Sequence, residues 1–240
     1  MIRLLAFDTS TDVMSMALLT PHGVQARDAA GGAQASARLV PDLLALLAEA
    51  GVALADLDAI AFGCGPGAFT GLRTACSVVQ GLAFGAGKPV VPVDSLLIVA
   101  HDARLQLGDA APAQVWVAMD ARMDEVYAGA YRWHAGRWSV ASPPALYGVD
   151  ALNARWQAAA PALVAGSAVE AFGDRLALGP AVTVARERSR AQALVEVAAR
   201  QFAEGRTVEA AQALPVYLRD KVALTTVERE AARAAKEAAA

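Results

Sequence analysis

A glycine-rich stretch at residues 63–73, with the sequence GCGPGAFTGLR, constrains the fold of this chain more than any other segment. It joins an apolar run, Leu57–Phe62, to a helical pattern, Leu72–Phe84, so it is expected to be a strand-to-helix turn. Glycine permits positive φ and the close approach of another group, and such a loop at a helix N-terminus can bind an anion. The stretch therefore predicts either a phosphate-binding loop or a rigid turn that sets the direction of the following helix.

The composition indicates a globular chain with ample material for a core. Of its 240 residues, 56% are hydrophobic, and this length suits two small lobes. The net charge is −3 and no dense basic run occurs, which argues against tight nucleic-acid binding by this chain alone. The two cysteines and three histidines lack zinc-site spacing, and no apolar run reaches the roughly 18–20 residues of a membrane span. We therefore expect a cytoplasmic protein without a metal site or a membrane contact.

The order of predicted elements starts a second time halfway along the chain. Val115–Asp120 is an apolar strand that ends in aspartate, as Leu4–Asp8 is, and each is followed by a turn and another strand. This order predicts an α/β, two-lobed, actin-like fold of the sugar kinase and Hsp70 type, with a mixed β-sheet and packed helices in each lobe. The predicted division is an N-terminal lobe at 1–105 carrying the dimerisation helices, a smaller C-terminal lobe at 106–225 and an alanine-rich tail at 226–240.

Two turns could contact a nucleotide in such a fold. Asp8, Thr9 and Ser10 follow the first strand, where an aspartate and hydroxyls would face magnesium and phosphates. The alternative is a local Asx-type turn without a ligand. The equivalent turn of the second lobe, with Arg122, is bulky and charged where a phosphate-binding turn should be rich in glycine or hydroxyls. Nucleotide or complex contacts at these four residues therefore remain open.

The glycine stretch is not a Walker A loop, because no Gly-Lys-Ser/Thr follows it. It offers Thr70 as a candidate N-cap of the following helix. The residues assigned to a structural turn are Gly65, Pro66, Gly67, Thr70 and Gly71.

Two predicted helices, Ser36–Ala50 and the one at residues 72–85, carry more apolar side chains than one sheet can cover. We favour a partner interface on both helices, with a thick monomer core as the alternative. The predicted interface residues are Leu39, Val40, Leu43, Leu47, Leu72, Arg73, Cys76, Val79, Gln80 and Ala83.

Segments spread in order over almost the whole chain resemble the TsaB (YeaZ) family of bacterial tRNA threonylcarbamoyladenosine biosynthesis proteins. The most specific are G-x-G-P-G-x-F-T-G-x-R at 63–73 and D-A-R-M-x-E-V-Y at 120–127. The other matching segments are Leu5–Thr11, Leu54–Ala61, Gln80–Gly85, Val91–Leu96 and Pro215–Asp220.

The resemblance implies a non-catalytic scaffold subunit with no catalytic residue and no cofactor or metal of its own. Its partner would be the paralogous TsaD, in a complex that includes the ATPase TsaE and modifies N6 of adenosine 37 in tRNAs reading ANN codons. ATP and metal would belong to the partner subunits, tRNA would be contacted indirectly, and the chain alone would form a homodimer through its first two helices.

Three positions depart from the family pattern: Cys64, Ala68 and Ala35 stand where Arg, Ser and His are frequent. The first two departures weaken any anion contact in the glycine loop. Two other functions remain as alternatives. A small-molecule kinase would bind ATP tightly with magnesium, and a peptidase would need a metal cluster or a nucleophile–histidine pair, neither of which is legible in the sequence.

Overall fold

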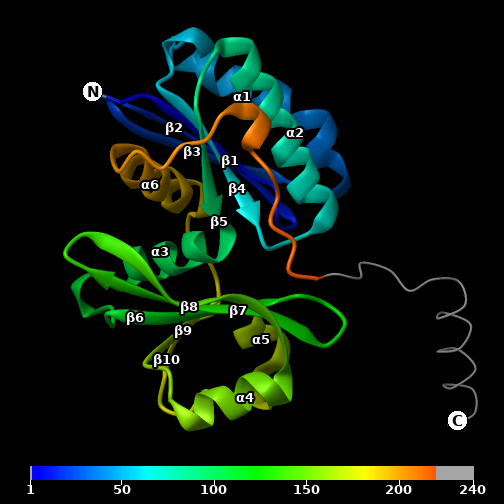
Figure 1. The fold of residues 1–240 in the computed structure, drawn as a ribbon, viewed down its shortest axis with the longest axis vertical. Helices are drawn as coiled ribbons and strands as arrows, with labels where there is room; N and C mark the ends of the chain where they lie inside the picture. Colours follow the sequence, from blue (N-terminus) through cyan, green and yellow to red (C-terminus); the bar gives the residue numbers. More distant parts are fainter. Residues whose placement is uncertain (1, 220–240) are drawn as a thin grey trace, which may run out of the picture.

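The computed structural model describes residues 2–219, which form two five-stranded sheets with helices packed on both faces (Figure 1). The first sheet contains β1 (Leu4–Asp8), β2 (Val13–Thr20), β3 (Gly23–Ala30), β4 (Ala59–Gly65) and β5 (Val90–Asp94). The second contains β6 (Gln114–Asp120), β7 (Glu125–His134), β8 (Arg137–Gly148), β9 (Leu163–Ala165) and β10 (Val182–Val184). The helices are α1 (Ala35–Glu49), α2 (Phe69–Ala86), α3 (Ser95–Leu107), α4 (Val149–Ala158), α5 (Ala168–Phe172) and α6 (Arg190–Ala203). Within residues 2–219, none of the helices is long and apolar enough to cross a membrane.

The two sheets are built to the same plan. The first has the strand order β3-β2-β1-β4-β5, and the second, read from its other edge, has β8-β7-β6-β9-β10. In each sheet the first three strands in sequence pair antiparallel, and the remaining two run parallel to the central strand. The predicted two-lobed α/β fold with mixed sheets is therefore confirmed.

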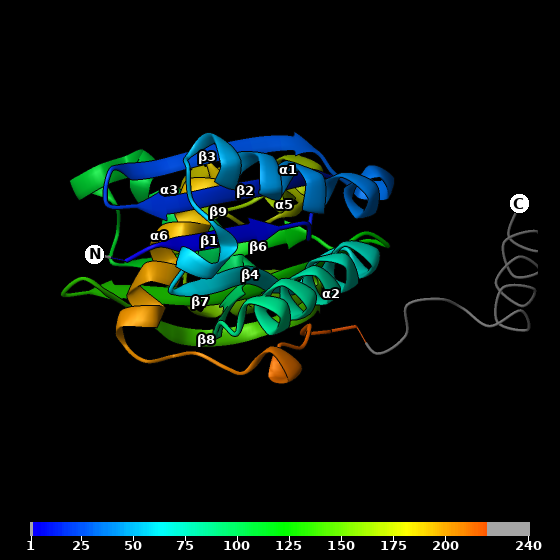
Figure 2. The same ribbon diagram turned by 90° about the horizontal axis from the view of Figure 1, so that it is seen from above.

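Alternating side chains of the central strands supply three hydrophobic cores. Leu4 packs in the core that contains α3 and α6, whereas its neighbour Leu5 packs in the core beneath α1 and α2. In the second lobe Val117 joins the first of these cores, whereas Trp116 packs with α4 and α5. The views in Figure 1 and Figure 2 show the resulting layers, with α3 and α6 between the sheets and the other helices outside. Both lobes thus share one central core.

The chain returns to the first lobe after completing the second sheet. Helix α6 packs against the first sheet, Val208 pairs with Val90 through two backbone hydrogen bonds, and the Val216 N–H donates to the Cys64 carbonyl at 2.7 Å. The prediction that 106–225 forms the C-terminal lobe is therefore wrong for the described residues from 190 onward. An amphipathic pattern reveals that a helix has a buried face, but not which sheet that face covers. The tail predicted at 226–240 lies outside the described residues.

Candidate functional site: the interlobe cleft and the α1–α2 face

The glycine stretch packs directly against the turn that follows β1. A Cβ added at Gly63 would lie 1.9 Å from a carboxylate oxygen of Asp8, and one at Gly71 would lie 1.8 Å from the carbonyl oxygen of Thr9. Only glycine leaves room for this approach. The Thr9 hydroxyl also donates to the Gly71 carbonyl at 2.7 Å. The stretch thus joins β1, β4 and α2 tightly, as expected of a rigid turn.

The amides of this loop are used inside the protein. Helix α2 begins at Phe69, and Ala68 holds the N-cap position without a side-chain bond, so the prediction of Thr70 as N-cap is wrong. The Ala68 N–H donates to the Ser10 carbonyl at 2.8 Å, and the Gly65 N–H donates to the Ser95 hydroxyl at 3.1 Å. These two donors are therefore engaged and do not point at a free anion site.

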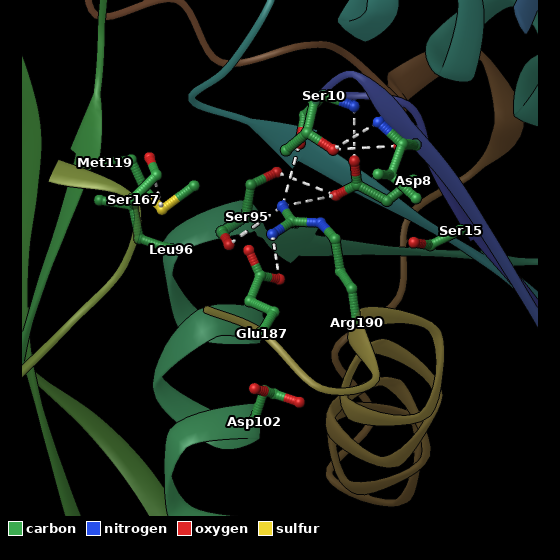
Figure 3. A network of polar contacts seen from close by, with 12 residues as sticks. Asp8, Ser10, Ser15, Ser95, Leu96, Asp102, Met119, Ser167, Glu187 and Arg190 are labelled. Atoms are coloured by element: carbon green, nitrogen blue, oxygen red, sulfur yellow. Dashed lines mark hydrogen bonds and ion pairs between the residues drawn. The ribbon is translucent and has the colours of Figure 1, made fainter. Parts of the chain in front are cut away.

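A buried arginine covers Asp8, as the close view in Figure 3 shows. One guanidinium nitrogen of Arg190 lies 3.2 Å from Asp8 Oδ2 and donates to Ser10 Oγ at 3.0 Å, while the other donates to Glu187 Oε2 at 2.6 Å. Asp8 is completely buried and Arg190 is 6% exposed. The Asp8 carboxylate and the Ser10 hydroxyl, which would face magnesium and phosphates in a nucleotide site, are thus bonded to a side chain of this protein.

The electrostatics of this cluster keep the arginine charged. Burial alone lowers the pKa of Arg190, but Asp8 and Glu187 outweigh that effect, so its pKa lies above the usual value. Burial raises the pKa of Glu187, and the attraction of Arg190 opposes the rise. Removing the arginine would leave the buried Asp8 and the partly buried Glu187 without their counter-charge.

A cleft of about 770 Å³ separates the lobes and is lined by residues of both. Ser10 and Arg122 line it, whereas Asp8 and Thr9 do not. The Arg122 side chain is 75% exposed and pairs with Asp12 of the first lobe at 3.4 Å. The structure therefore separates the four predicted nucleotide contacts into two that face the cleft and two that serve the fold.

In the second-lobe turn, as at Asp8, polar groups are bonded to other groups of the same chain. Arg122, Met123 and Asp124 are consecutive non-glycine residues with φ values of 63°, 55° and 62°, a strained left-handed conformation. Arg175 grips the Asp124 carboxylate with two bonds of 2.6 Å, and Arg219 donates to the carbonyl of Arg122 at 3.2 Å. The N–H of Arg122 donates to the side chain of Asp120 at 2.8 Å. This turn is held in shape by side chains and keeps that amide from a phosphate.

Most of the predicted interface residues lie in the core. Seven of the ten are buried, Val40 and Gln80 are half-buried, and Arg73 is exposed. The buried seven are Leu39, Leu43, Leu47, Leu72, Cys76, Val79 and Ala83. Six of them pack in the core beneath α1 and α2, and Leu72 lines the interlobe cleft, so the fold of the chain itself buries the side chains that were predicted to contact a partner. The same two helices instead expose Leu44, at 48%, and Phe84, at 85%.

The described cysteines and the buried histidine are engaged in structural contacts. Burial raises the pKa of the Cys64 thiol to about 12, and the Cys76 thiol donates to the Ala213 carbonyl at 3.0 Å. His101 Nδ1 accepts from Trp138 at 3.2 Å, which leaves Nε2–H to donate to Glu196 at 3.0 Å. Among residues 2–219 no three His, Cys, Asp or Glu side chains group as a metal site. These contacts lend no support to the peptidase alternative.

Sequence reasoning missed Arg190, Glu187 and Ser95, the residues that surround Asp8. The segment RERSR at residues 186–190 has the charge pattern of a solvated loop, and nothing in that pattern marks its last arginine as buried. Only the tertiary fold, which brings the start of α6 beneath the end of β1, could have identified it.

Comparison with known proteins agrees with this architecture. The family model for TsaD, tRNA N6-adenosine threonylcarbamoyltransferase, matches residues 23–227. The tRNA threonylcarbamoyladenosine biosynthesis protein TsaB of Escherichia coli K12 is 34% identical over 234 residues, which is 92% of this chain and 96% of that protein. TsaB of Haemophilus influenzae is 42% identical over 126 residues, 52% of each chain. The solved structure of YeaZ from Pseudomonas aeruginosa matches with a TM-score of 0.80 and 42% identity, over 91% of this chain and 100% of that one. The chain therefore belongs to the TsaB (YeaZ) family of tRNA threonylcarbamoyladenosine biosynthesis proteins.

Proposed function

We propose that this protein is a cytoplasmic, non-catalytic scaffold subunit for threonylcarbamoylation of N6 of adenosine 37 in tRNAs reading ANN codons. It acts by binding a TsaD-type paralogue. The observation that carries the proposal is the 85% exposure of Phe84 on the outer face of α2, because a large aromatic side chain in water marks a contact surface. The covered Asp8 supports the non-catalytic part of the proposal.

The proposed docking surface is the outer face of α1 and α2, which lie side by side on the first sheet (Figure 1). Its exposed positions are mainly small or apolar, so the backbone of a partner helix can approach closely. The small or apolar exposed positions are Ala37, Pro41, Leu44, Ala45, Ala48, Ser77, Gly81, Phe84 and Gly85, and the two helices also expose Ser36, Arg38, Glu49, Thr70 and Arg73. A paralogue of the same fold would present an equivalent helix pair, and so would a second copy, which accounts for a homodimer when the chain is alone.

The test is co-purification with a TsaD-type partner after the double change Leu44→Asp and Phe84→Asp. Both side chains are exposed, so the variant should fold, and two charges in the interface should weaken binding at least tenfold. Val140→Asp is the matched control, because Val140 is 56% exposed on the second lobe. Undiminished capture of the folded double variant would refute the proposed surface.

We propose that ATP and metal are bound by the partner subunits, which include a TsaE-type ATPase. This chain alone binds neither. Arg190 covers Asp8 with a permanent charge, which opposes the approach of a divalent cation. Titration calorimetry of the isolated chain with magnesium-ATP should give no saturable heat. Tight binding would favour the kinase alternative instead.

A further inference from the structure

A group of arginine and tryptophan side chains lies on α3, α6 and the β7–β8 hairpin. Helices α3 and α6 lie between the two sheets, on the opposite face of the first sheet from α1 and α2 (Figures 1 and 2). The guanidinium carbons of Arg104 and Arg200 lie 4.8 Å and 5.1 Å from the ring centroid of Trp133. Trp138 packs edge-on against the same ring, with centroids 5.1 Å apart. We name these four residues the waist cluster.

The two arginines of the waist cluster have no carboxylate within salt-bridge distance among the described residues. Arg200 donates only to the carbonyl of Gly136, at 3.2 Å. Of the fourteen other arginines among residues 2–219, nine pair with a carboxylate, whereas Arg3, Arg73, Arg132, Arg155 and Arg188 do not. Those that pair are Arg27, Arg38, Arg122, Arg137, Arg175, Arg186, Arg190, Arg206 and Arg219. The waist cluster thus brings together two arginines without a direct ion pair in the described part of the chain, although Glu196 acts on Arg200 from a greater distance, on a chain whose net charge is −3.

The nearby acidic groups are already engaged. Glu196 accepts hydrogen bonds from His101 and Gln192, at 3.0 Å and 2.9 Å. Glu204 is shared by two further arginines, Arg137 at 3.7 Å and Arg206 at 2.6 Å. Glu204 thus offers one negative charge to two arginines, and a bound anion would supply a further counter-charge near the cluster.

Contact with the Trp133 ring restricts both guanidinium groups before a phosphate binds. Arg104 and Arg200 each lie about 5 Å from one ring centroid, so their guanidinium carbons are no more than about 10 Å apart. A guanidinium held beside an indole ring keeps N–H groups available, and it loses less freedom when it binds an anion. Phosphates follow each other every ~3.4 Å of rise along one strand of a duplex, so the pair can reach two phosphates of the same backbone.

We propose that the waist cluster binds the phosphate backbone of tRNA through Arg104 and Arg200. This inference rests on the proposed function, since it places the tRNA on the assembly that contains this subunit. Guanidinium groups bind phosphate through paired hydrogen bonds, and such contacts position a nucleic acid without reading its sequence. The surface stays free when a partner covers the outer face of α1 and α2, because α3 and α6 pack on the opposite face of the first sheet.

The experiment measures binding of fluorescently labelled tRNA to the assembly of this chain with its TsaD-type partner, over a series of salt concentrations. The double variant R104Q/R200Q should weaken binding about tenfold at physiological salt. It should also reduce the slope of log K against log salt by about 1.4–1.8, since each lost phosphate contact removes ~0.7–0.9. The single variant R200Q, at an exposed position, should give about half of that reduction. The variant R27Q, at a partly exposed arginine of the first lobe that pairs with Glu49, should leave the slope unchanged.

The salt slope separates a tRNA contact from a structural role. Both arginines lie in the last turn of a helix, where a cation stabilises the helix dipole. A structural role alone would lower the melting temperature of R104Q/R200Q without changing the slope, and that result would overturn the proposal. Light scattering of the same samples reports whether the assembly forms. If the assembly does not form, the proposed function fails. The waist cluster is then tested by titrating labelled tRNA with the isolated chain, where R104Q/R200Q should give the same reduction in the slope of log K against log salt.

Discussion

The interlobe cleft and the outer face of α1 and α2 differ in whether their side chains have partners within the chain. Beside the cleft, Asp8 and Ser10 already have hydrogen-bonding partners from within the chain, and Arg190 supplies the positive charge. On the helix face, Leu44 and Phe84 are left in water. A surface that satisfies its own polar groups needs no ligand, whereas exposed apolar side chains gain free energy from a partner. The difference is the basis for proposing that this chain binds a partner through its helix face.

The largest expected effect on stability comes from Arg190→Ala, which removes the internal partner of the acidic groups beside the cleft. Asp8 and Glu187 would lose their buried counter-charge, so we expect the free energy of unfolding to fall by about 3–5 kcal/mol. Urea denaturation measures it. Arg186→Ala, which removes an exposed arginine paired with Glu170, should change stability by less than about 0.5 kcal/mol. Equal effects of the two changes would mean that the cluster at Asp8 does not stabilise the fold.

Two glycines of α2 allow the rigid-turn interpretation to be tested on one helix. Gly71→Ala would force a Cβ to 1.8 Å from the Thr9 carbonyl, so we expect a loss of about 3 kcal/mol or more. Gly81→Ala meets nothing within 4 Å and should stabilise the helix by up to about 1 kcal/mol. Thermal melts of both variants give the comparison. A Gly71→Ala protein as stable as wild type would show that the loop does not depend on this contact.

A smaller effect concerns the pH dependence of stability at Cys64. Burial holds its pKa at about 12 in the folded protein against 9.0 as the ordinary value, so the unfolded chain loses this proton first. Stability should therefore fall as pH rises from about 9 toward 12, by at most about 1.4 kcal/mol per pH unit. Between pH 8 and pH 10, wild type should lose more stability than Cys64→Ala in urea titrations. Parallel losses in the two proteins would contradict the assignment to this thiol.

The sequence predicted the layers of this fold better than the orientation of its helices. Strands such as Leu4–Asp8 and Val115–Asp120 have short apolar patterns that end in aspartate, and the structure confirms the repeated plan. The helices were harder, because α1 and α2 carry apolar residues on several sides. The sequence therefore did not distinguish Leu43, which faces the sheet, from Leu44, which faces solvent.

At the Asp8 turn, the local sequence predicted the turn itself but not the distant residue that covers it. The Asp8 turn was identified as either a ligand site or an Asx-type turn, and the Ser10 N–H does donate to Asp8 Oδ1. Its covering residue, Arg190, is 182 positions away in the chain. No local pattern could report that contact, since it depends on how the last helix returns to the first sheet.

The most direct test of the account is light scattering of this 24.7 kDa chain, alone and mixed with a TsaD-type paralogue. We predict that the chain alone has the mass of a dimer and that the equimolar mixture has the mass of a one-to-one heterodimer. We also predict that both assemblies are lost with Leu44→Asp and Phe84→Asp. A mixture that scatters as two independent components, with both proteins folded, would contradict the central claim that this protein works by binding a paralogue.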